Sequence, residues 1–116
     1  MEIKIEIDTH DNMLAFDLFE SKELIADRTE KSISDNVSVK FEGEVFRKAE
    51  GLPRIIEMTL IFAKEVITPI ILGIVSAWLY DKIKGRSVTL RIEKTEVTMN
   101  KDKIKSVLIE KIEKRE

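Results

Sequence analysis

A run of apolar residues from Val66 to Tyr80 constrains the fold of this chain more than any other segment. Its only polar residues are Thr68 and Ser76. An α-helix of these fifteen residues is about 23 Å long, which is short of the roughly 30 Å hydrocarbon core of a bilayer. We therefore predict that protein, rather than lipid, encloses most of this run.

Membrane attachment is a second hypothesis for the same run. Trp78 and Tyr80 stand near its end, where aromatic residues mark a membrane interface, and Lys82 and Lys84 follow them. These four side chains would anchor the end of a tilted span or of a helix that lies in the interface. The sequence leaves both hypotheses open.

The periodicity of the other segments predicts one α+β domain over residues 1–116. Ile3, Ile5 and Ile7 alternate with charged residues, which indicates a half-buried strand. A similar alternation runs from residue 37 to 42, and its continuation past a bulge at Gly43 toward Val45 is an option. Residues 88–99 alternate in the same way on both sides of a short connection at Lys94 and Thr95, as in a hairpin. The expected sheet has four strands: two strands, then the C-terminal hairpin.

Three helices are expected to cover one face of that sheet. The first takes up residues 11–28, either unbroken or with a break near Ser21, and the polar stretch 29–36 after it is expected to be a loop. The central helix is long, over residues 53–84, with a kink at Pro69, because proline removes a backbone hydrogen bond and clashes with the preceding turn. The last helix begins at Asn100, whose side chain can cap it.

The expected central helix has more apolar surface than one small sheet can cover. The faces around Ile70, Ile74 and Trp78 therefore remain for a contact with another protein. Gly73 and Ala77 form a pair of small residues that lets a neighbouring helix or strand approach closely. We predict that Ile70, Ile74, Ala77 and Trp78 form an interface with a second copy of the chain or with a protein partner.

The composition excludes several classes of function. The absence of cysteine rules out thiolate zinc sites, disulfides and thiol nucleophiles. The formal net charge of −2 lacks the overall basic character of a general nucleic-acid binder, so a nucleic-acid partner is not expected. The chain contains no phosphate-binding glycine loop, and its single histidine supports no Ser-His-Asp arrangement. We therefore expect a protein that is not an enzyme and has no cofactor.

One short segment has side chains of the kind that bind metal ions. Asp8, His10 and Asp11 follow one another at the end of the first strand. The simpler interpretation is that Asp8 ends the strand, Asp11 caps the next helix and His10 is a surface loop residue. Because a metal site normally needs further ligands and groups that orient them, we expect no metal site here.

A basic patch follows the apolar run. Lys82, Lys84 and Arg86 could contact the phosphates of a nucleic acid or a lipid. Cations are also common at the C-terminal end of a helix, where they complement its dipole, and we favour this structural interpretation.

The order of elements in the C-terminal two-thirds follows a recognisable pattern. An apolar helix ends in AWLYDKIKGR and is followed by a VTLRIE strand, an EVTM strand and an amphipathic helix, and FDLFESKELIADR precedes them as a short leucine-rich helix. In these segments the chain resembles the effector-associated constant-component family of small accessory proteins in bacterial conflict and defence systems. It departs from the pattern at Pro69 and in a hairpin that lacks a glycine turn. The resemblance implies a non-enzymatic accessory or adaptor component.

Together these observations predict a small interaction or adaptor module that self-associates through its central apolar helix. The alternative is a small membrane-attached protein, anchored by the helix that ends at Trp78 and Tyr80. The first residues, MEIKIEID, lack the basic region and apolar stretch of a signal peptide. A cytoplasmic location is therefore expected, with membrane association as the alternative.

Overall fold

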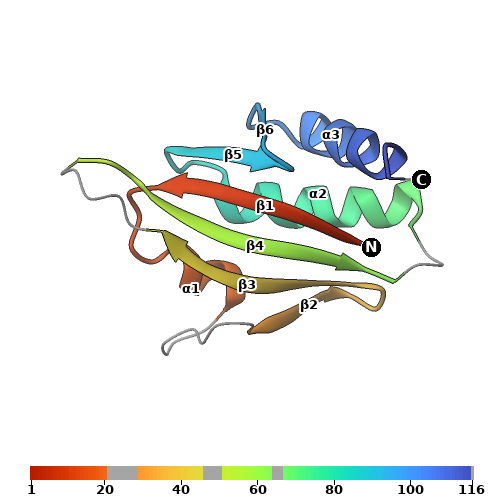
Figure 1. Cartoon of the computed structure of the whole chain (residues 1–116), viewed down its shortest axis with the longest axis horizontal. Coiled ribbons are helices and arrows are strands. Elements are labelled where there is room, and N and C mark those ends of the chain that lie inside the picture. The colour runs from red at the N-terminus through yellow and green to blue at the C-terminus, as the bar shows by residue number, and fades with distance from the viewer. Residues whose placement is uncertain (21–28, 46–50, 64–66, 116) are drawn as a thin grey trace.

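A six-stranded antiparallel sheet forms the frame of the protein. The computed structural model describes residues 1–20, 29–45, 51–63 and 67–115. The strand order is β2-β3-β4-β1-β5-β6, and Figure 1 shows the strands as one layer. The strands are β1 (Glu2–Thr9), β2 (Glu30–Ser34), β3 (Val37–Val45), β4 (Arg54–Phe62), β5 (Val88–Ile92) and β6 (Thr95–Val97).

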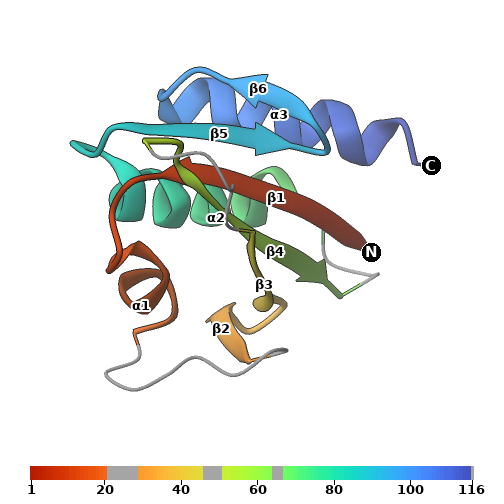
Figure 2. The same cartoon turned by 60° about the vertical axis from the view of Figure 1, so that its left-hand side comes forward.

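Three helices lie on one face of this sheet. They are α1 (Leu14–Phe19), α2 (Pro69–Ile83) and α3 (Lys101–Glu113). Figures 1 and 2 show α2 behind β1 and β4, with α3 beside it and α1 near β3. The other face of the sheet carries no helix in the part of the chain that the structure describes. The α+β class is thus confirmed, as two layers.

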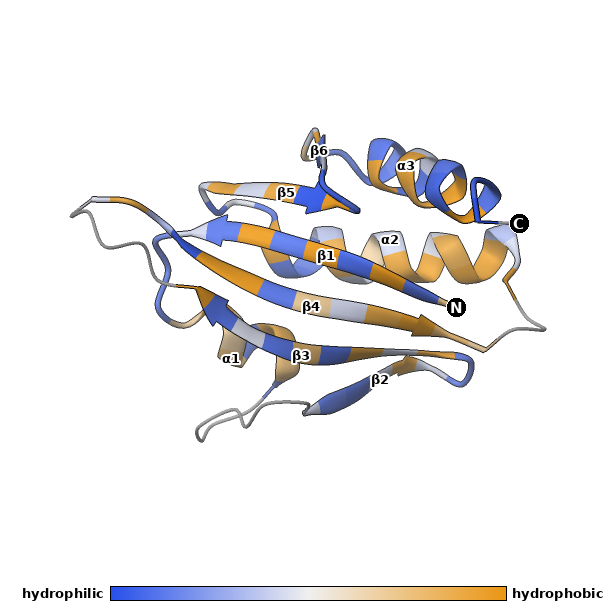
Figure 3. Ribbon diagram, viewed as in Figure 1, coloured by the Kyte–Doolittle hydropathy of each residue, from blue (hydrophilic) through white to orange (hydrophobic). Residues whose placement is uncertain are grey.

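The core fills the space between the sheet and the helices. Alternate residues of β1, namely Ile3, Ile5 and Ile7, are almost completely buried, while the residues between them point to the open face. Figure 3 shows the same alternation of apolar and polar residues along the strands. The core also contains Leu79 of α2 and Leu108 of α3, so one continuous apolar cluster joins both layers.

The prediction of a long, kinked central helix is wrong. Residues 54–62 form strand β4, in which Ile56, Met58 and Leu60 are buried at every second position. Pro69 does not interrupt a helix but is the first residue of α2, where the missing amide hydrogen has no helical partner. The Thr68 hydroxyl caps this end by accepting a hydrogen bond from the Ile71 amide at 3.2 Å.

The prediction of a four-stranded sheet is also wrong, since β2 and β4 join the expected strands. Strand β2 lies within the segment expected to be a loop, and it pairs with β3 from Glu30 opposite Lys40 onward. Helix α1 is shorter than expected within the described residues. It ends before Glu20, whose positive φ of 50° leaves the helical region; the rest of the predicted helix, residues 21–28, lies outside the described residues.

The predictions for β1, β3 and the C-terminal segments are confirmed. Strand β3 continues past a bulge, because its register with β4 shifts between Phe41 and Gly43. The hairpin of β5 and β6 is present, but it turns at Glu93 and Lys94, both with positive φ, which is one residue earlier than expected. The Asn100 side chain caps α3 by accepting hydrogen bonds from the backbone amides of Asp102 and Lys103.

Candidate functional site

Helix α2 is held in the middle of the helical layer. Leu72, Val75 and Leu79 are buried against the core. The buried Ser76 hydroxyl donates a hydrogen bond to the Leu72 carbonyl at 2.7 Å. This polar group on the inward side of the helix therefore has a hydrogen-bond partner. Helix α3 packs beside α2 at Gly73, where a Cβ atom would lie 3.9 Å from the Lys105 amine.

The side of α2 that points away from the sheet is also apolar. We call it the α2 outward face; it consists of Ile70, Ile71, Ile74, Ala77 and Trp78, at spacings of three and four residues along one side of the helix. Ile70 is 76% exposed and Ile74 is 41% exposed. Figure 3 shows α2 as apolar along most of its length. A helix that is apolar all round is normally enclosed on all sides.

The four predicted interface residues thus lie on one face. Ile70 and Ile74 stand out from it, whereas Ala77 and Trp78 are half-buried. Trp78 also packs against the core. Its indole Nε1 is buried and has no hydrogen-bond partner in the described part of the chain, so the ring contributes apolar surface to this face rather than a free donor.

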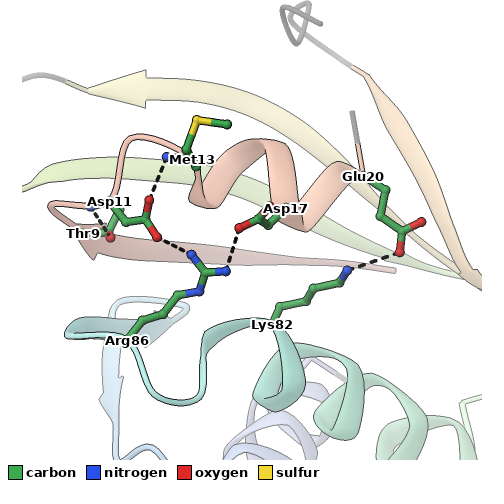
Figure 4. A network of polar contacts seen from close by, with 7 residues as sticks. All are labelled: Thr9, Asp11, Met13, Asp17, Glu20, Lys82 and Arg86. Carbon is green, nitrogen blue, oxygen red and sulfur yellow. Dashed lines mark hydrogen bonds and ion pairs between the residues drawn. The ribbon is translucent and has the colours of Figure 1, made fainter. Parts of the chain in front are cut away.

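The predicted basic patch does not form one free surface. Figure 4 shows that Arg86 reaches across to Asp11, in the loop before α1, and pairs at 2.6 Å with Asp17 of α1. The hydrogen bond that Arg86 donates to the Asp17 carboxylate is the main reason why the pKa of Arg86 is raised. Lys84 pairs instead with Asp81 of its own helix at 3.5 Å. These carboxylates offset much of the positive charge that a phosphate would need.

The remaining member of the patch belongs to a second cluster at the end of α1. The Lys82 amine lies 3.2 Å from the Glu20 carboxylate, and the Lys31 amine of β2 lies 2.5 Å from the same group. The hydrogen bond from Lys31, followed by that from Lys82, lowers the pKa of Glu20. The ion pairs of Arg86 and Lys82 therefore link α1 to the C-terminal end of α2.

The structure also separates the residues considered as metal ligands. The Asp8 carboxylate accepts two hydrogen bonds from Arg91, at 3.0 and 2.5 Å, and this pairing raises the pKa of Arg91. Asp11 accepts from the Met13 amide at 2.8 Å and pairs with Arg86, while His10 is exposed. Among the described residues, no three ligand-type side chains are placed to hold a metal ion.

The open face of the sheet has a hollow that sequence reasoning did not identify. It has a volume of about 290 Å³ and includes Lys4, Glu6, Glu57 and Lys94 in its lining. Glu6 stands directly opposite Glu57 on neighbouring strands, and Arg91 lies 3.5 Å from Glu6. The charged positions of MEIKIEID signal a polar face but not this hollow. Its lining mixes both signs of charge, which favours no single class of ligand.

Comparisons with known proteins add no identity. No protein-family model, no curated protein and no solved structure matches the chain, so the resemblance to effector-associated constant-component proteins stays a prediction. Within the described ranges, no helix is both long enough and apolar enough to cross a membrane. The α2 outward face is the surface that departs most from an ordinary solvated exterior, and it is the candidate functional site.

Proposed function

We propose that the protein is a non-enzymatic interaction module that self-associates through the α2 outward face. The observation that carries this proposal is the exposure of Ile70 and Ile74, at 76% and 41%, on a helix side with no charged residue until Asp81. Contiguous exposed apolar residues of this kind mark interaction sites in otherwise polar surfaces.

The neighbouring helix supplies an internal comparison. Helix α3 lies in the same layer, and its exposed positions are all polar: Lys101, Asp102, Lys103, Ser106, Glu110 and Glu113. Its buried positions are apolar, as in an ordinary surface helix. The chain thus provides polar residues where a helix faces water, which supports the interpretation that the α2 outward face is covered when the protein acts.

Membrane attachment is the second candidate, and the side chains that would anchor it have other contacts. Trp78 and Tyr80 are half-buried and pack against the core. Lys82 and Lys84 pair with carboxylates at 3.2 and 3.5 Å. An interfacial helix needs free aromatic and basic side chains at the membrane surface, so the contacts of these four residues favour a protein partner.

The test is the solution mass of the full chain over a range of about 1 μM to about 1 mM, measured by sedimentation. Self-association should raise the mass with concentration. Ile74→Asp should weaken it at least tenfold, because each copy would bury an unpaired carboxylate. Leu52→Asp is the matched control, since Leu52 is 47% exposed and lies outside the helix.

Two results would contradict the proposal. One is a wild-type mass that stays at 13.4 kDa throughout the range. The other is an oligomer that the Ile74→Asp substitution leaves unchanged while circular dichroism shows native folding. Binding of the full chain to vesicles of mixed neutral and anionic lipid, lost in Ile74→Asp and kept in Leu52→Asp, would favour the membrane candidate instead.

A further inference from the structure

We propose that two copies pack with their α2 helices antiparallel, about a two-fold axis that passes at Ile74. This inference rests on the proposed function and adds the geometry of the contact. It assigns the partner as a second copy of this chain and excludes a parallel arrangement of the two helices.

The shapes of the side chains on the α2 outward face fit this arrangement. In a two-fold contact, residues equally far from the axis on either side face one another. With the axis at Ile74, the protruding Ile70 meets Trp78 of the second copy, and Ile71 meets Ala77. Large side chains then face a half-buried ring or a small residue. A parallel pair in register would instead set Trp78 against Trp78 and Ile70 against Ile70.

The charges at the two ends of the face also select the antiparallel arrangement. Asp81 continues the face toward the helix C-terminus, and its side chain is 64% exposed. The first turn of α2 has no acidic residue, and the amides of a first turn carry the positive end of the helix dipole. An antiparallel partner brings Asp81 opposite Ile67, just before that turn, whereas a parallel partner brings Asp81 against Asp81.

The contact between Asp81 and Lys84 does not prevent this role. The two side chains are 64% and 57% exposed and 3.5 Å apart. A pair so exposed contributes little, and the carboxylate has further acceptor sites. Asp81 can therefore approach the first turn of the second copy without losing a strong interaction of its own.

Single cysteines test the geometry directly, because the chain has none of its own. At the two-fold axis, helices 10 Å apart place the two Cα atoms of residue 74 about 5 Å apart, within disulfide range. Residue 70 and its symmetry mate are displaced by about 12 Å along the axes, which is too far. The Ile74→Cys protein should therefore form a covalent dimer on mild oxidation, and Ile70→Cys should not.

A mixture of two variants adds a positive test of the pairing. Ile70→Cys and Trp78→Cys proteins should form mixed dimers, in preference to dimers of either variant alone, because these two residues face one another across the axis. Leu52→Cys is the control for random collisions, since Leu52 is 47% exposed and lies outside the helix. Thermal unfolding of each reduced variant shows that it is folded before the oxidation step.

The sign of one charge effect separates the two arrangements independently. Asp81→Asn should weaken self-association about three- to tenfold, because the favourable contact with the helix end occurs twice in an antiparallel dimer. In a parallel dimer the same substitution would remove a repulsion and strengthen association. Lys111→Gln on α3 is the control, because it also removes one unit of charge but lies outside the proposed contact.

The outcomes distinguish this inference from the proposed function. Self-association that depends on Ile74 but gives efficient Ile70→Cys dimers, or that is strengthened by Asp81→Asn, overturns the antiparallel geometry and leaves the interaction module standing. A wild-type chain that remains monomeric up to about 1 mM overturns both.

Discussion

Replacing Pro69 by alanine tests whether this proline lies inside a kinked helix, as the sequence predicted, or begins α2, as in the structure. The two positions predict opposite changes in the free energy of unfolding. Inside a helix, proline costs about 3 kcal/mol relative to alanine, so Pro69→Ala would stabilise a kinked helix by about that amount. In the structure Pro69 is the first residue of α2 and is exposed. It therefore breaks no helical hydrogen bond, and its side chain fills no core space.

Pro69→Ala is therefore expected to lower the unfolding free energy by a small amount, rather than to raise it. Alanine at this position loses the restriction that proline places on the unfolded chain, which destabilises a protein by about 0.4 to 1 kcal/mol. With a urea dependence of about 2 kcal/mol per molar, the unfolding midpoint should fall by about 0.2 to 0.5 M. A kinked helix would instead raise the midpoint by about 1.5 M.

The assay is urea unfolding followed by circular dichroism at a fixed protein concentration. Thr68→Ala serves as a companion variant, because losing the hydrogen bond from the Ile71 amide should cost about 1 kcal/mol. An increase of more than about 1 kcal/mol in the unfolding free energy of Pro69→Ala would refute the reasoning, since no first-turn proline can produce it.

Three further predictions concern the core and the contacts of α1. Leu79→Ala should reduce the unfolding free energy by about 2 to 5 kcal/mol in urea titrations, because Leu79 is completely buried, while the exposed Leu52→Ala should change it by less than about 0.5 kcal/mol. Arg86→Met should cost about 1 to 2 kcal/mol in the same assay through loss of two partly exposed ion pairs, and Lys84→Met at most about 0.5 kcal/mol. Because the pKa of Glu20 is lowered in the folded state, its contribution is present above the ordinary value of 4.5 and is lost as the pH falls toward the folded pKa. Thermal unfolding of wild type and Glu20→Gln should therefore differ at pH 7 and converge in acid; a difference that grows below pH 4.5 would contradict this assignment.

The segments predicted correctly from the sequence are those whose pattern has a single interpretation. In β1 three isoleucines alternate with charged residues, and only a strand with one wet face has that period. Asn100 stands directly before an apolar stripe with helical spacing, and its side chain does cap α3. Local chemistry was sufficient in both places because the residues that decide the structure are neighbours in the chain.

The segments predicted incorrectly depend on contacts between distant residues. Strand β4 lacks a strict alternation because Ile55 and Ile61 stand next to the buried alternate residues, and a mostly apolar run without alternation fits a helix as well as a strand. Strand β2 has one large apolar residue, Ile33, and is defined by its pairing with β3. A sequence pattern records burial but not pairing, so both strands became visible only once the sheet was known.

The same distinction applies to the candidate site. The apolar side chains of the α2 outward face could be grouped from their spacing, because a helix fixes the relative positions of residues three and four apart. The contacts of Lys82 and Arg86 could not, since their partners on α1 and beside its two ends are 62, 69 and 75 residues away in the chain. The members of the predicted basic patch pair with carboxylates instead: Lys82 and Arg86 with those on or beside α1, and Lys84 with Asp81 of α2.

The corrected fold changes the argument for our proposal that a partner covers the α2 outward face. The sequence argument was that a small sheet could not cover a long helix, and the sheet is in fact larger and the helix shorter than expected. The inward side of α2 is fully covered by that sheet, with α3 along one flank. The exposed apolar surface of α2 is confined to the side around Ile74, away from the sheet. Helix α2 cannot turn this side toward the sheet without exposing Leu72 and Leu79, so the antiparallel second copy that we propose would cover it from outside the two layers.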